Sequence, residues 1–130
     1  MPPDDATATE ARHRSNCDFP TEKILPVVDL FITDYSTTVL DYLAFEKPFV
    51  LFAPDLKEYE QTRGFFVDYR SITKNWTDDA GQLEMLVRDV YQRWQAGDRE
   101  EIVRCKERFA AACDGKATER ILDYLKERIQ

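Results

Sequence analysis

Two short, continuous apolar segments constrain the fold of this chain more than any other feature of its sequence. They are residues 30–33 (LFIT) and residues 48–52 (PFVLF). Continuous apolar runs of this length are typical of strands that are buried on both faces of a parallel sheet. A short helix is predicted between them, with an apolar face formed by Val39, Leu40, Leu43 and Ala44. Strand, helix and strand in this order predict a tight, right-handed βαβ unit.

Three amphipathic helices are predicted in the C-terminal part of the chain. Apolar residues recur at helical spacing over 80–95, over about 99–113 and over about 117–129. Gly97 and Gly115 fit the ends of the first and second helix, because glycine readily adopts the left-handed conformation that often follows a helix. A periodic pattern of this length makes these the firmest secondary-structure predictions in the chain.

The segment between the second strand and these helices carries weaker signals. Residues 54–64 form a polar excursion that ends in glycine, residues 65–69 are aromatic and predict a short extended segment, and residues 70–79 predict another loop. A short helical turn is predicted before the first strand, with Thr21 as its cap. The coarse order is therefore α–β–α–β–loop–α–α–α.

This order predicts an α/β fold that is partly Rossmann-like, with a small parallel sheet of two or three strands followed by three helices. Open doubly wound sheets typically have about five or six strands, so the predicted sheet resembles part of a larger one. Residues 1–18 are polar with little periodicity and predict a flexible N-terminal segment. Residues 19–130 are expected to carry the fold.

Charge and composition exclude several classes of function. The chain has 25 acidic and 18 basic side chains and a formal net charge of −7, whereas a general nucleic-acid binder usually presents a basic face. A zinc site needs about four clustered Cys or His ligands, and the chain has one histidine, His13, and three cysteines without a CxxC pair. No apolar run approaches the ~18–20 residues of a membrane span. We predict no metal, no cofactor and no nucleic-acid partner.

The cysteines Cys17, Cys105 and Cys113 are predicted to be reduced thiols, because their number is odd and their spacing suggests no disulfide framework. Cys105 and Cys113 fit the apolar stripe of the predicted second helix and are expected to be packing residues. At the start of that helix, Asp98 and Glu101 resemble a capping box, in which each side chain binds a backbone N–H group of the other residue.

The segment 29–48 (DLFITDYSTTVLDYLAFEKP) contains the best candidate for a chemical site. An apolar strand leads into a turn at Asp34, and Ser36, Thr37 and Thr38 open the predicted helix, with Ser36 as its cap. The first N–H groups of a helix lack internal partners and carry partial positive charge, which favours a phosphate or diphosphate. The three hydroxyl groups can add hydrogen bonds, and Asp41 can accept hydrogen bonds from a ribose diol.

A simpler interpretation of the same residues stays open. Ser36 can cap the helix without binding a ligand, Asp34 can stabilise the turn through its own backbone, and Asp41 can be a solvated surface acid. The local sequence does not decide between a phosphate site and a capped turn.

Three motifs in order give a further indication. TDYSTTVLDYLAFEKP, then FAPDLKEYEQTRGFFVDY, and later DGKATERILDYL closely resemble the C-terminal region of the CDP-glycerol glycerophosphotransferase family, over about residues 24–128. These enzymes make teichoic-acid-type polymers in bacteria. The resemblance implies the GT-B architecture, in which two Rossmann-like domains enclose the active site and the C-terminal domain holds the nucleotide donor. Residues 19–130 would then be a truncated C-terminal, donor-binding domain.

The resemblance also implies where the donor binds. Asp34, Ser36 and Thr37 match the aspartate and the paired serines of the family motif that borders the donor diphosphate, and Asp41 matches the acid of the following helix. The ribose contact of Asp41 is inferred from its position. Arg63 and Arg120 match the later motifs, and for both arginines a structural role is favoured over a phosphate contact.

Some family features are not matched. After RGFFVDY the chain reads SITKNWTDD, where the family usually has a proline–glycine–proline-like loop that faces the cleft. The family also carries a histidine in a proline-flanked motif some thirty residues before the TDYSS-type motif. His13 lies in unrelated sequence and is not assigned that role. No catalytic residue is therefore predicted within this chain.

The resemblance implies transfer of an alcohol phosphate, such as glycerol phosphate from CDP-glycerol or a related CDP-alcohol, to an acceptor hydroxyl in cell-wall or surface polymer synthesis. The isolated chain is expected to bind nucleotide weakly without turnover, in the cytoplasm or at the inner face of the membrane. Two alternatives remain. The chain is a non-catalytic interaction module, completed by a second copy or by an N-terminal domain in trans, or it is a degenerate remnant without a ligand.

Overall fold

A computed structural model describes residues 20–129 of the chain. A short helix α2 (Thr21–Ile24) leads to strand β1 (Phe31–Thr33), and helix α3 (Thr38–Tyr42) with the 3-10 turn η1 (Leu43–Phe45) connects β1 to strand β2 (Phe49–Phe52). Strands β1 and β2 are parallel, with Phe31 opposite Phe49 and Thr33 opposite Leu51. The predicted βαβ unit is confirmed.

A third strand completes the sheet on the other side of β2. It is β3 (Trp76–Thr77), which also runs parallel and places Trp76 opposite Leu51. The strand order is therefore β1-β2-β3. The predicted fold class, an α/β chain with a small parallel sheet followed by three helices, is confirmed. The extended segment expected at 65–69 is wrong, because those residues form a loop that leads into the 3-10 turn η2 (Tyr69–Ser71).

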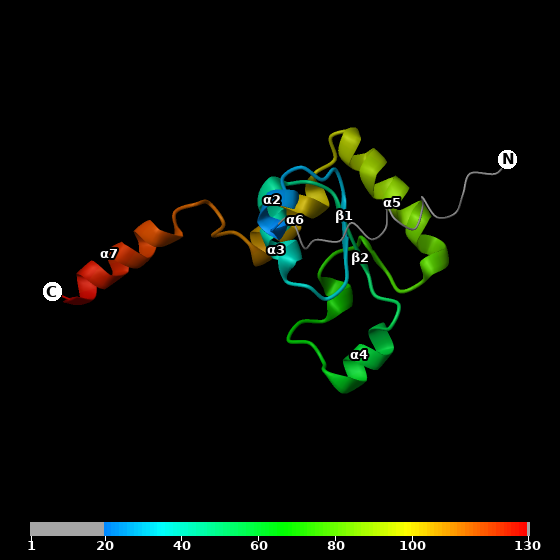
Figure 1. Ribbon diagram of the computed structural model, residues 1–130, viewed down its shortest axis with the longest axis horizontal. Helices are drawn as coiled ribbons and strands as arrows, with labels where there is room; N and C mark the ends of the chain where they lie inside the picture. The colour runs from blue at the N-terminus through cyan, green and yellow to red at the C-terminus, as the bar shows by residue number, and fades with distance from the viewer. Residues whose placement is uncertain (1–19, 130) are drawn as a thin grey trace.

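Helices lie on both sides of the sheet (Figure 1). Helix α5 (Ala80–Gln95) packs against β2 and β3, whereas α6 (Glu100–Phe109) packs against η1, and α3 contacts β1. Strand β2 is the centre of this arrangement, because Phe49, Val50 and Leu51 are all buried. The core around them draws on α3, η1, α4 (Leu56–Thr62), η2 and α6, through Tyr42, Leu43, Leu56, Tyr69 and Cys105.

Two elements differ from the sequence prediction in the middle of the chain. Residues 54–64 contain the helix α4 (Leu56–Thr62), which was predicted as a polar excursion. Helix α6 ends at Phe109, so Cys113 lies beyond it and is exposed, while Cys105 is buried as expected. The packing role predicted for Cys113 is wrong, because the turn at 110–115 takes the chain out of the helical register.

The capping box predicted for α6 is only half present. Asp98 accepts a hydrogen bond from the N–H of Glu100 at 3.1 Å, as a capping residue does. Glu101 instead turns toward the loop before β3, where it accepts hydrogen bonds from the Thr73 hydroxyl at 2.9 Å and from the Lys74 N–H at 2.6 Å. It also forms an ion pair with Arg104 at 2.8 Å. Glu101 therefore holds α6 against the loop rather than capping its own helix.

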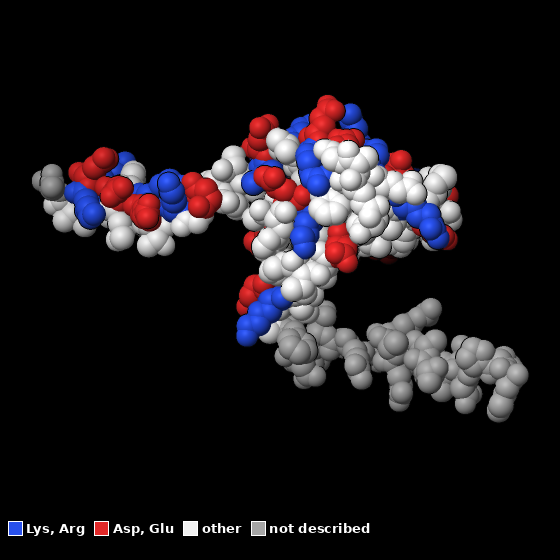
Figure 2. Space-filling view, turned by 90° about the horizontal axis from the view of Figure 1, so that it is seen from above, with Lys and Arg blue, Asp and Glu red and all other residues white. Residues whose placement is uncertain are grey.

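The last helix, α7 (Ala117–Ile129), has the predicted bounds but contains no buried residue. It projects away from the rest of the molecule in both views (Figures 1 and 2). The cysteine Cys17, the histidine His13 and the predicted flexible segment lie outside the described residues. None of the described helices is long and apolar enough to cross a membrane.

Candidate functional site

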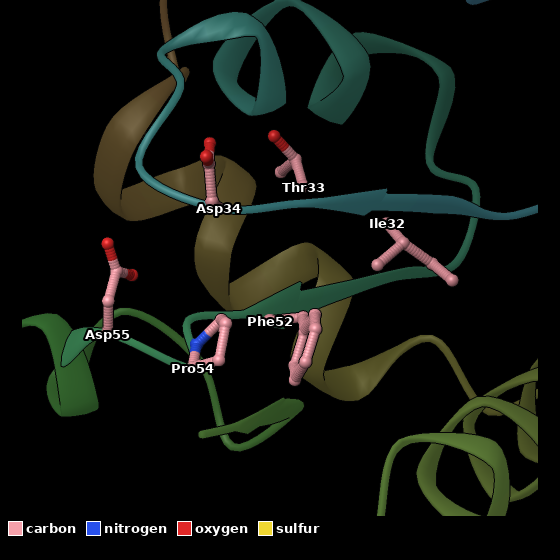
Figure 3. Close-up of a pocket in the computed structure, with 6 residues that line it drawn as sticks. All are labelled: Ile32, Thr33, Asp34, Phe52, Pro54 and Asp55. Atoms are coloured by element: carbon pink, nitrogen blue, oxygen red, sulfur yellow. The ribbon is translucent and has the colours of Figure 1, made fainter. Parts of the chain in front are cut away.

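A wide, open hollow of about 700 Å³ lies at the carboxyl ends of β1 and β2. Its lining comes from the last residues of both strands and from the loops that follow them: Ile32, Thr33, Asp34, Phe52, Pro54 and Asp55. Figure 3 shows the carboxylates of Asp34 and Asp55 on two neighbouring loops at this edge of the sheet. Parallel α/β sheets bind ligands at this edge, because the loops there leave the strands in diverging directions.

The loop after β1 is held by short-range hydrogen bonds. The Asp34 carboxylate accepts hydrogen bonds from the N–H groups of Tyr35 at 2.6 Å and Ser36 at 3.3 Å. The Ser36 hydroxyl donates to the Thr38 hydroxyl at 2.8 Å and accepts from the Thr38 N–H at 3.2 Å. Two of the N–H groups that the phosphate hypothesis invokes, those of Ser36 and Thr38, therefore already have partners in this loop.

Helix α3 begins later than predicted. Its capping position is Thr37, which has helical backbone angles and no side-chain capping bond, and Ser36 acts one residue earlier through the N–H of Thr38. The predicted role of Ser36 as the capping residue is thus wrong in its position, although its hydroxyl does satisfy one N–H group of the first turn. An anion that bound here would have to compete with the Asp34 carboxylate for the same donors.

Two tyrosines that sequence analysis did not single out hold the two loops together. The Tyr35 hydroxyl donates to the Asp55 carboxylate at 2.7 Å, and the Tyr69 hydroxyl donates to the backbone carbonyl of Asp34 at 3.1 Å. Burial, followed by its hydrogen bond to Asp55, raises the pKa of Tyr35. Burial and the nearby Asp34 likewise raise the pKa of Tyr69. Both hydroxyls therefore stay protonated near neutral pH and act as donors.

The tyrosines belong to a cluster of aromatic rings beside the hollow. The Tyr35 ring stacks on Tyr59 with centroids 3.8 Å apart, and Phe65 lies 5.0 Å from Tyr59 and 5.4 Å from Tyr69. The Arg63 guanidinium lies 5.9 Å from the centroid of Tyr59. The sequence signal for this cluster is the recurrent aromatic residue after an aspartate, as in Asp34-Tyr35 and Asp68-Tyr69, but the pattern does not show that the rings meet.

Of the predicted site residues, only Asp34 lines this hollow. Thr38 and Asp41 line a second hollow of about 300 Å³ between α3 and α2, together with Thr21, Glu22, Leu25 and Phe45. Asp34, Ser36 and Thr37 therefore lie together in the loop after β1, and Thr38 follows them as the first residue of α3. Asp41 lies further along α3 and lines the second hollow.

Arg120 lies in α7, which projects away from the body (Figure 1), and lines neither hollow. Its guanidinium bonds both carboxylate oxygens of Asp114 at 2.9 Å and the carbonyl of Ala112 at 2.8 Å. The Lys116 N–H, followed by Arg120, lowers the pKa of Asp114. The position of Arg120 agrees with the structural role favoured for it, although its partner is Asp114 rather than an acid on its own helix.

No metal centre is evident in the part of the chain that the structure describes: residues 20–129 contain no group of three or more His, Cys, Asp or Glu side chains that could hold an ion. The candidate site therefore consists of two carboxylates, a hydroxyl-rich loop and protonated tyrosines. This set can accept and donate hydrogen bonds to a polar ligand and can orient it, but it presents no free cationic group in the hollow itself.

The fold and the hollow together define the class of this chain, a small α/β fold with an open hollow at the carboxyl ends of its parallel strands. The sequence profile of the family described as CDP-Glycerol:Poly(glycerophosphate) glycerophosphotransferase matches residues 10–127. The chain belongs to this family. The resemblance inferred from the three motifs is confirmed, because the matched region contains all of them.

Individual relatives agree with this assignment. The chain is 26% identical over 102 residues to a teichoic acid ribitol-phosphate primase of Bacillus spizizenii, a match that covers 78% of this chain and 25% of the relative. It is 30% identical over 109 residues to a teichoic acid poly(glycerol phosphate) polymerase of Staphylococcus epidermidis, covering 80% of this chain and 15% of the relative. The chain thus spans about a quarter or less of the length of these relatives.

A solved structure shares the fold. The wall teichoic acid polymerase TagF superposes on this chain with a TM-score of 0.60 and 28% sequence identity, over 82% of this chain and 26% of that one. The similarity extends over most of the described residues, so the small parallel sheet and its helices occur within a much longer relative.

Proposed function

We propose that this chain forms the part of a glycerophosphotransferase-type enzyme that binds a CDP-alcohol donor. The observation that carries the proposal is the hollow at the carboxyl ends of β1 and β2, which is lined by Asp34 at the start of the 34–38 loop and lies inside the region that matches the family. Relatives named as primases and polymerases of glycerol phosphate and ribitol phosphate support a CDP-alcohol of either kind.

The reaction proposed for the complete enzyme is a phosphoryl-group transfer. An acceptor hydroxyl attacks the β-phosphorus of the CDP-alcohol, a new phosphodiester bond forms, the bond between the β-phosphorus and the bridging oxygen breaks, and CMP leaves with that oxygen. The acceptor proton passes to a base. Such catalysis depends mostly on positioning and on stabilisation of developing negative charge.

Within this chain, the proposed roles are to bind and orient the donor. The hydroxyl groups of Ser36, Thr37 and Thr38 would donate to the diphosphate oxygens, and the Asp34 carboxylate would hold the loop in shape through the N–H groups it now binds. Thr38 shares the second hollow with Asp41, which gives the ribose diol a place next to that carboxylate.

The two arginines receive different roles in this proposal. Arg63 lies over the Tyr59 ring at the margin of the aromatic cluster, where its guanidinium can meet a phosphate that enters from that side. Arg120 remains a structural residue, because Asp114 and the Ala112 carbonyl occupy its guanidinium. The Asp34 and Asp55 carboxylates accept hydrogen bonds that hold the two loops, and we propose that they keep this role and do not act as a general base, so we expect binding without turnover.

A titration with nucleotides tests the binding proposal. Amide chemical shifts of the full chain should change at residues 34–41 on addition of CDP-glycerol, with weaker changes for CMP, at concentrations up to about 1 mM, which is the weak end of specific binding. The double variant Ser36→Ala with Thr37→Ala should weaken binding at least about fivefold, because each lost hydrogen bond contributes about 1 kcal/mol. Thr118→Ala, an exposed hydroxyl on α7, is the matched control.

No shift at residues 34–41 with millimolar CDP-glycerol would sink the binding proposal and favour a remnant without a ligand. Measurable transfer to an acceptor by this chain alone would contradict the proposal that it only binds the donor.

We further propose that transfer requires a second polypeptide surface, supplied by an N-terminal domain in trans or by a second copy, in the cytoplasm or at the inner face of the membrane. The sheet supports this, because β1 is bonded to β2 on one side only and exposes Ile32 by 45%. An unpaired strand edge is a ready site for a further strand. Addition of a separately produced N-terminal region of a relative should give measurable transfer. If this chain binds the donor and transfer is still absent, the result counts against an N-terminal domain in trans.

A further inference from the structure

Two tyrosine hydroxyls tie residues 34–38, which we call the donor loop, to distant parts of the chain. The other side-chain hydrogen bonds of this loop join residues that are one or two positions apart. Such local bonds shape a loop, but they do not fix its place relative to other elements. Within residues 20–129, its long-range hydrogen bonds are those made by the Tyr35 and Tyr69 hydroxyls.

The bond from Tyr69 holds one peptide group of the donor loop from the carbonyl side. The Tyr69 hydroxyl donates to the Asp34 carbonyl at 3.1 Å, and the N–H of the same peptide, which belongs to Tyr35, donates to the Asp34 carboxylate at 2.6 Å. Because a peptide group is planar, a bond to its carbonyl also fixes the direction of its N–H. Tyr69 therefore sets the orientation of the peptide from which the donor loop continues.

The Tyr69 side chain is itself held by packing. It is 2% exposed, and its ring lies 5.4 Å from Phe65 and 6.3 Å from Trp76, measured between centroids. A buried tyrosine ring has little rotamer freedom left, and its hydroxyl needs a hydrogen-bond partner. The Asp34 carbonyl supplies that partner.

The turn η2, which carries Tyr69, is anchored to α6. Two arginines of that helix bind its carbonyl groups: Arg108 donates to Ser71 at 2.8 Å, and Arg104 donates to Ile72 at 2.9 Å. The helix α6 is in turn packed against η1. A continuous set of contacts therefore runs from the core of the molecule through η2 to the donor loop.

The bond from Tyr35 links the donor loop to the segment after β2. The Tyr35 hydroxyl donates to the Asp55 carboxylate at 2.7 Å, and its ring stacks on Tyr59 of α4 with centroids 3.8 Å apart. Tyr59 also lies under the Arg63 guanidinium, at 5.9 Å from the ring centroid. The same stack therefore places the donor loop beside the arginine that is proposed to meet a phosphate.

We propose that Tyr69 and Tyr35 are positioning residues for the donor diphosphate: they hold the donor loop so that its three hydroxyl groups meet the phosphate oxygens together. This inference rests on the proposed function, because it requires that the donor loop binds the donor. Neither tyrosine has to touch the ligand. A loop that is already held in its binding conformation loses less conformational entropy on binding, so its affinity depends on the residues that hold it.

Another buried tyrosine supplies a matched control. Tyr42, the last residue of α3, is 0% exposed, and its hydroxyl has no hydrogen-bond partner among the described residues. Tyr69→Phe and Tyr42→Phe thus remove the same atom from rings that are buried to a similar extent. Only Tyr69→Phe removes a bond to the donor loop.

Titration of the full chain with CDP-glycerol, followed by amide chemical shifts, tests the proposal. Tyr69→Phe should raise the dissociation constant at least about threefold, which is within the effect of one lost hydrogen bond. Tyr35→Phe should raise it about twofold, because Asp55 is exposed and water can replace the hydroxyl. Tyr42→Phe should leave it unchanged. For CMP the effect of Tyr69→Phe should be smaller, because CMP brings one phosphate group to the loop.

Two further measurements separate positioning from a purely structural role. A structural role of Tyr69 would lower the free energy of unfolding and leave the dissociation constant of the folded chain unchanged. Positioning also predicts faster hydrogen exchange at the N–H groups of Ser36 and Thr38 in Tyr69→Phe without nucleotide, because the loop that holds them is released. Tyr42→Phe should keep the wild-type exchange rates.

The outcomes distinguish this inference from the donor-binding proposal. If the wild-type chain binds CDP-glycerol and Tyr69→Phe binds it equally well, the positioning role is overturned and donor binding stands. An equal loss of affinity in Tyr42→Phe would also overturn the positioning role, since it would show a general effect of buried hydroxyls. If the wild-type chain shows no binding at about 1 mM, donor binding fails and this inference fails with it.

Discussion

Helices α5 and α7 have similar sequences in one respect and opposite surroundings in the structure. Both are amphipathic, and each carries apolar residues along one face. Helix α5 packs that face against β2 and β3 and buries Val90, whereas none of the residues of α7 is buried. An amphipathic pattern therefore specifies that a helix has a face to cover, but it does not specify what covers it.

The comparison separates two sources of stability. The body gains its stability from tertiary packing around β2, whereas α7 buries no residue and depends on local interactions within the helix and at its ends. Changes in the body should therefore affect the unfolding of the whole domain, whereas equivalent changes in α7 should affect only that helix.

The largest expected difference comes from one substitution made in both regions. Leu51→Ala in β2 removes a side chain that is 1% exposed and should lower the free energy of unfolding by about 2–5 kcal/mol. Leu125→Ala in α7 removes a side chain that is 45% exposed and should change it by less than about 0.5 kcal/mol. Urea unfolding followed by tryptophan fluorescence, at a concentration where the chain is monomeric, measures both. Equal losses would break the comparison, because they would show α7 packed on the body in solution.

A smaller difference should appear in the acid stability of the two regions. Burial raises the pKa of Glu101, but hydrogen bonds from Arg104, the Lys74 N–H and Thr73 outweigh it and lower the pKa from 4.5 to about 2. Because the folded pKa is lower, the unfolded chain binds more protons as the pH falls. The stability from Glu101 is thus present above about pH 4.5 and lost progressively toward pH 2, by about 1–3 kcal/mol. Unfolding curves at a series of pH values should show this loss.

Glu101→Gln should flatten this dependence, since it removes the titrating carboxylate. Glu60→Gln is the matched control: the hydrogen bond from Arg70, at 2.5 Å, lowers the pKa of Glu60 as well, but solvent screens this surface pair, so the variant should change the acid dependence less than Glu101→Gln does. An unchanged pH profile in Glu101→Gln would show that other groups control acid unfolding.

The smallest expected effects come from two capping aspartates. Asp98 and Asp114 each accept a hydrogen bond from the N–H two residues later, at 3.1 Å and 3.0 Å, at the starts of α6 and α7. Asp98→Ala should lower the stability of the domain by about 0.5–2 kcal/mol, because α6 is packed. Asp114→Ala should leave it unchanged but reduce the hydrogen-exchange protection of the first turns of α7. A loss of global stability in Asp114→Ala equal to that in Asp98→Ala would contradict the separation of the two regions.

The elements that sequence analysis predicted well are those whose pattern is set by a single buried face. Helix α5 has the predicted bounds because its apolar residues recur over four turns, and β2 is predicted because it is buried on both faces and continuously apolar. Helix α7 was also predicted with the right bounds, although it is exposed. The spacing of its apolar residues shows that the helix has an apolar face, whether or not another element packs against that face.

The errors fall where tertiary contacts decide the local structure. Helix α4 has a mainly polar sequence with Leu56 as its buried residue, so no apolar period reveals it. Strand β3 has only two residues, and pairing with β2 defines it rather than its own composition. Glu101 was assigned to a cap because the sequence cannot show that Thr73 and Lys74 lie beside it.

The candidate site was predicted as a set of residues but not as an arrangement. The loop 34–38 follows directly from an apolar strand, so its position at the edge of the sheet could be expected, although that strand was predicted to be buried and is an edge strand with Ile32 exposed. The hydrogen bonds of Tyr35 to Asp55 and of Tyr69 to Asp34 join residues that are 20 and 35 positions apart. Such contacts depend on the folded chain, and the role of these tyrosines could not be read from a single sequence.

The hydrogen bond from Tyr69 to the carbonyl of Asp34 gives this loop a built-in optical reporter. Tyr69 also meets the indole of Trp76 edge-on, with ring centroids 6.3 Å apart. The other tryptophan, Trp94, lies at the far end of α5, where its indole N–H donates to the Glu46 carbonyl. A movement of the loop after β1 should therefore shift Tyr69 and change the surroundings of the Trp76 indole. In a Trp94→Phe variant, the fluorescence of Trp76 would report a movement of Asp34 without any added label.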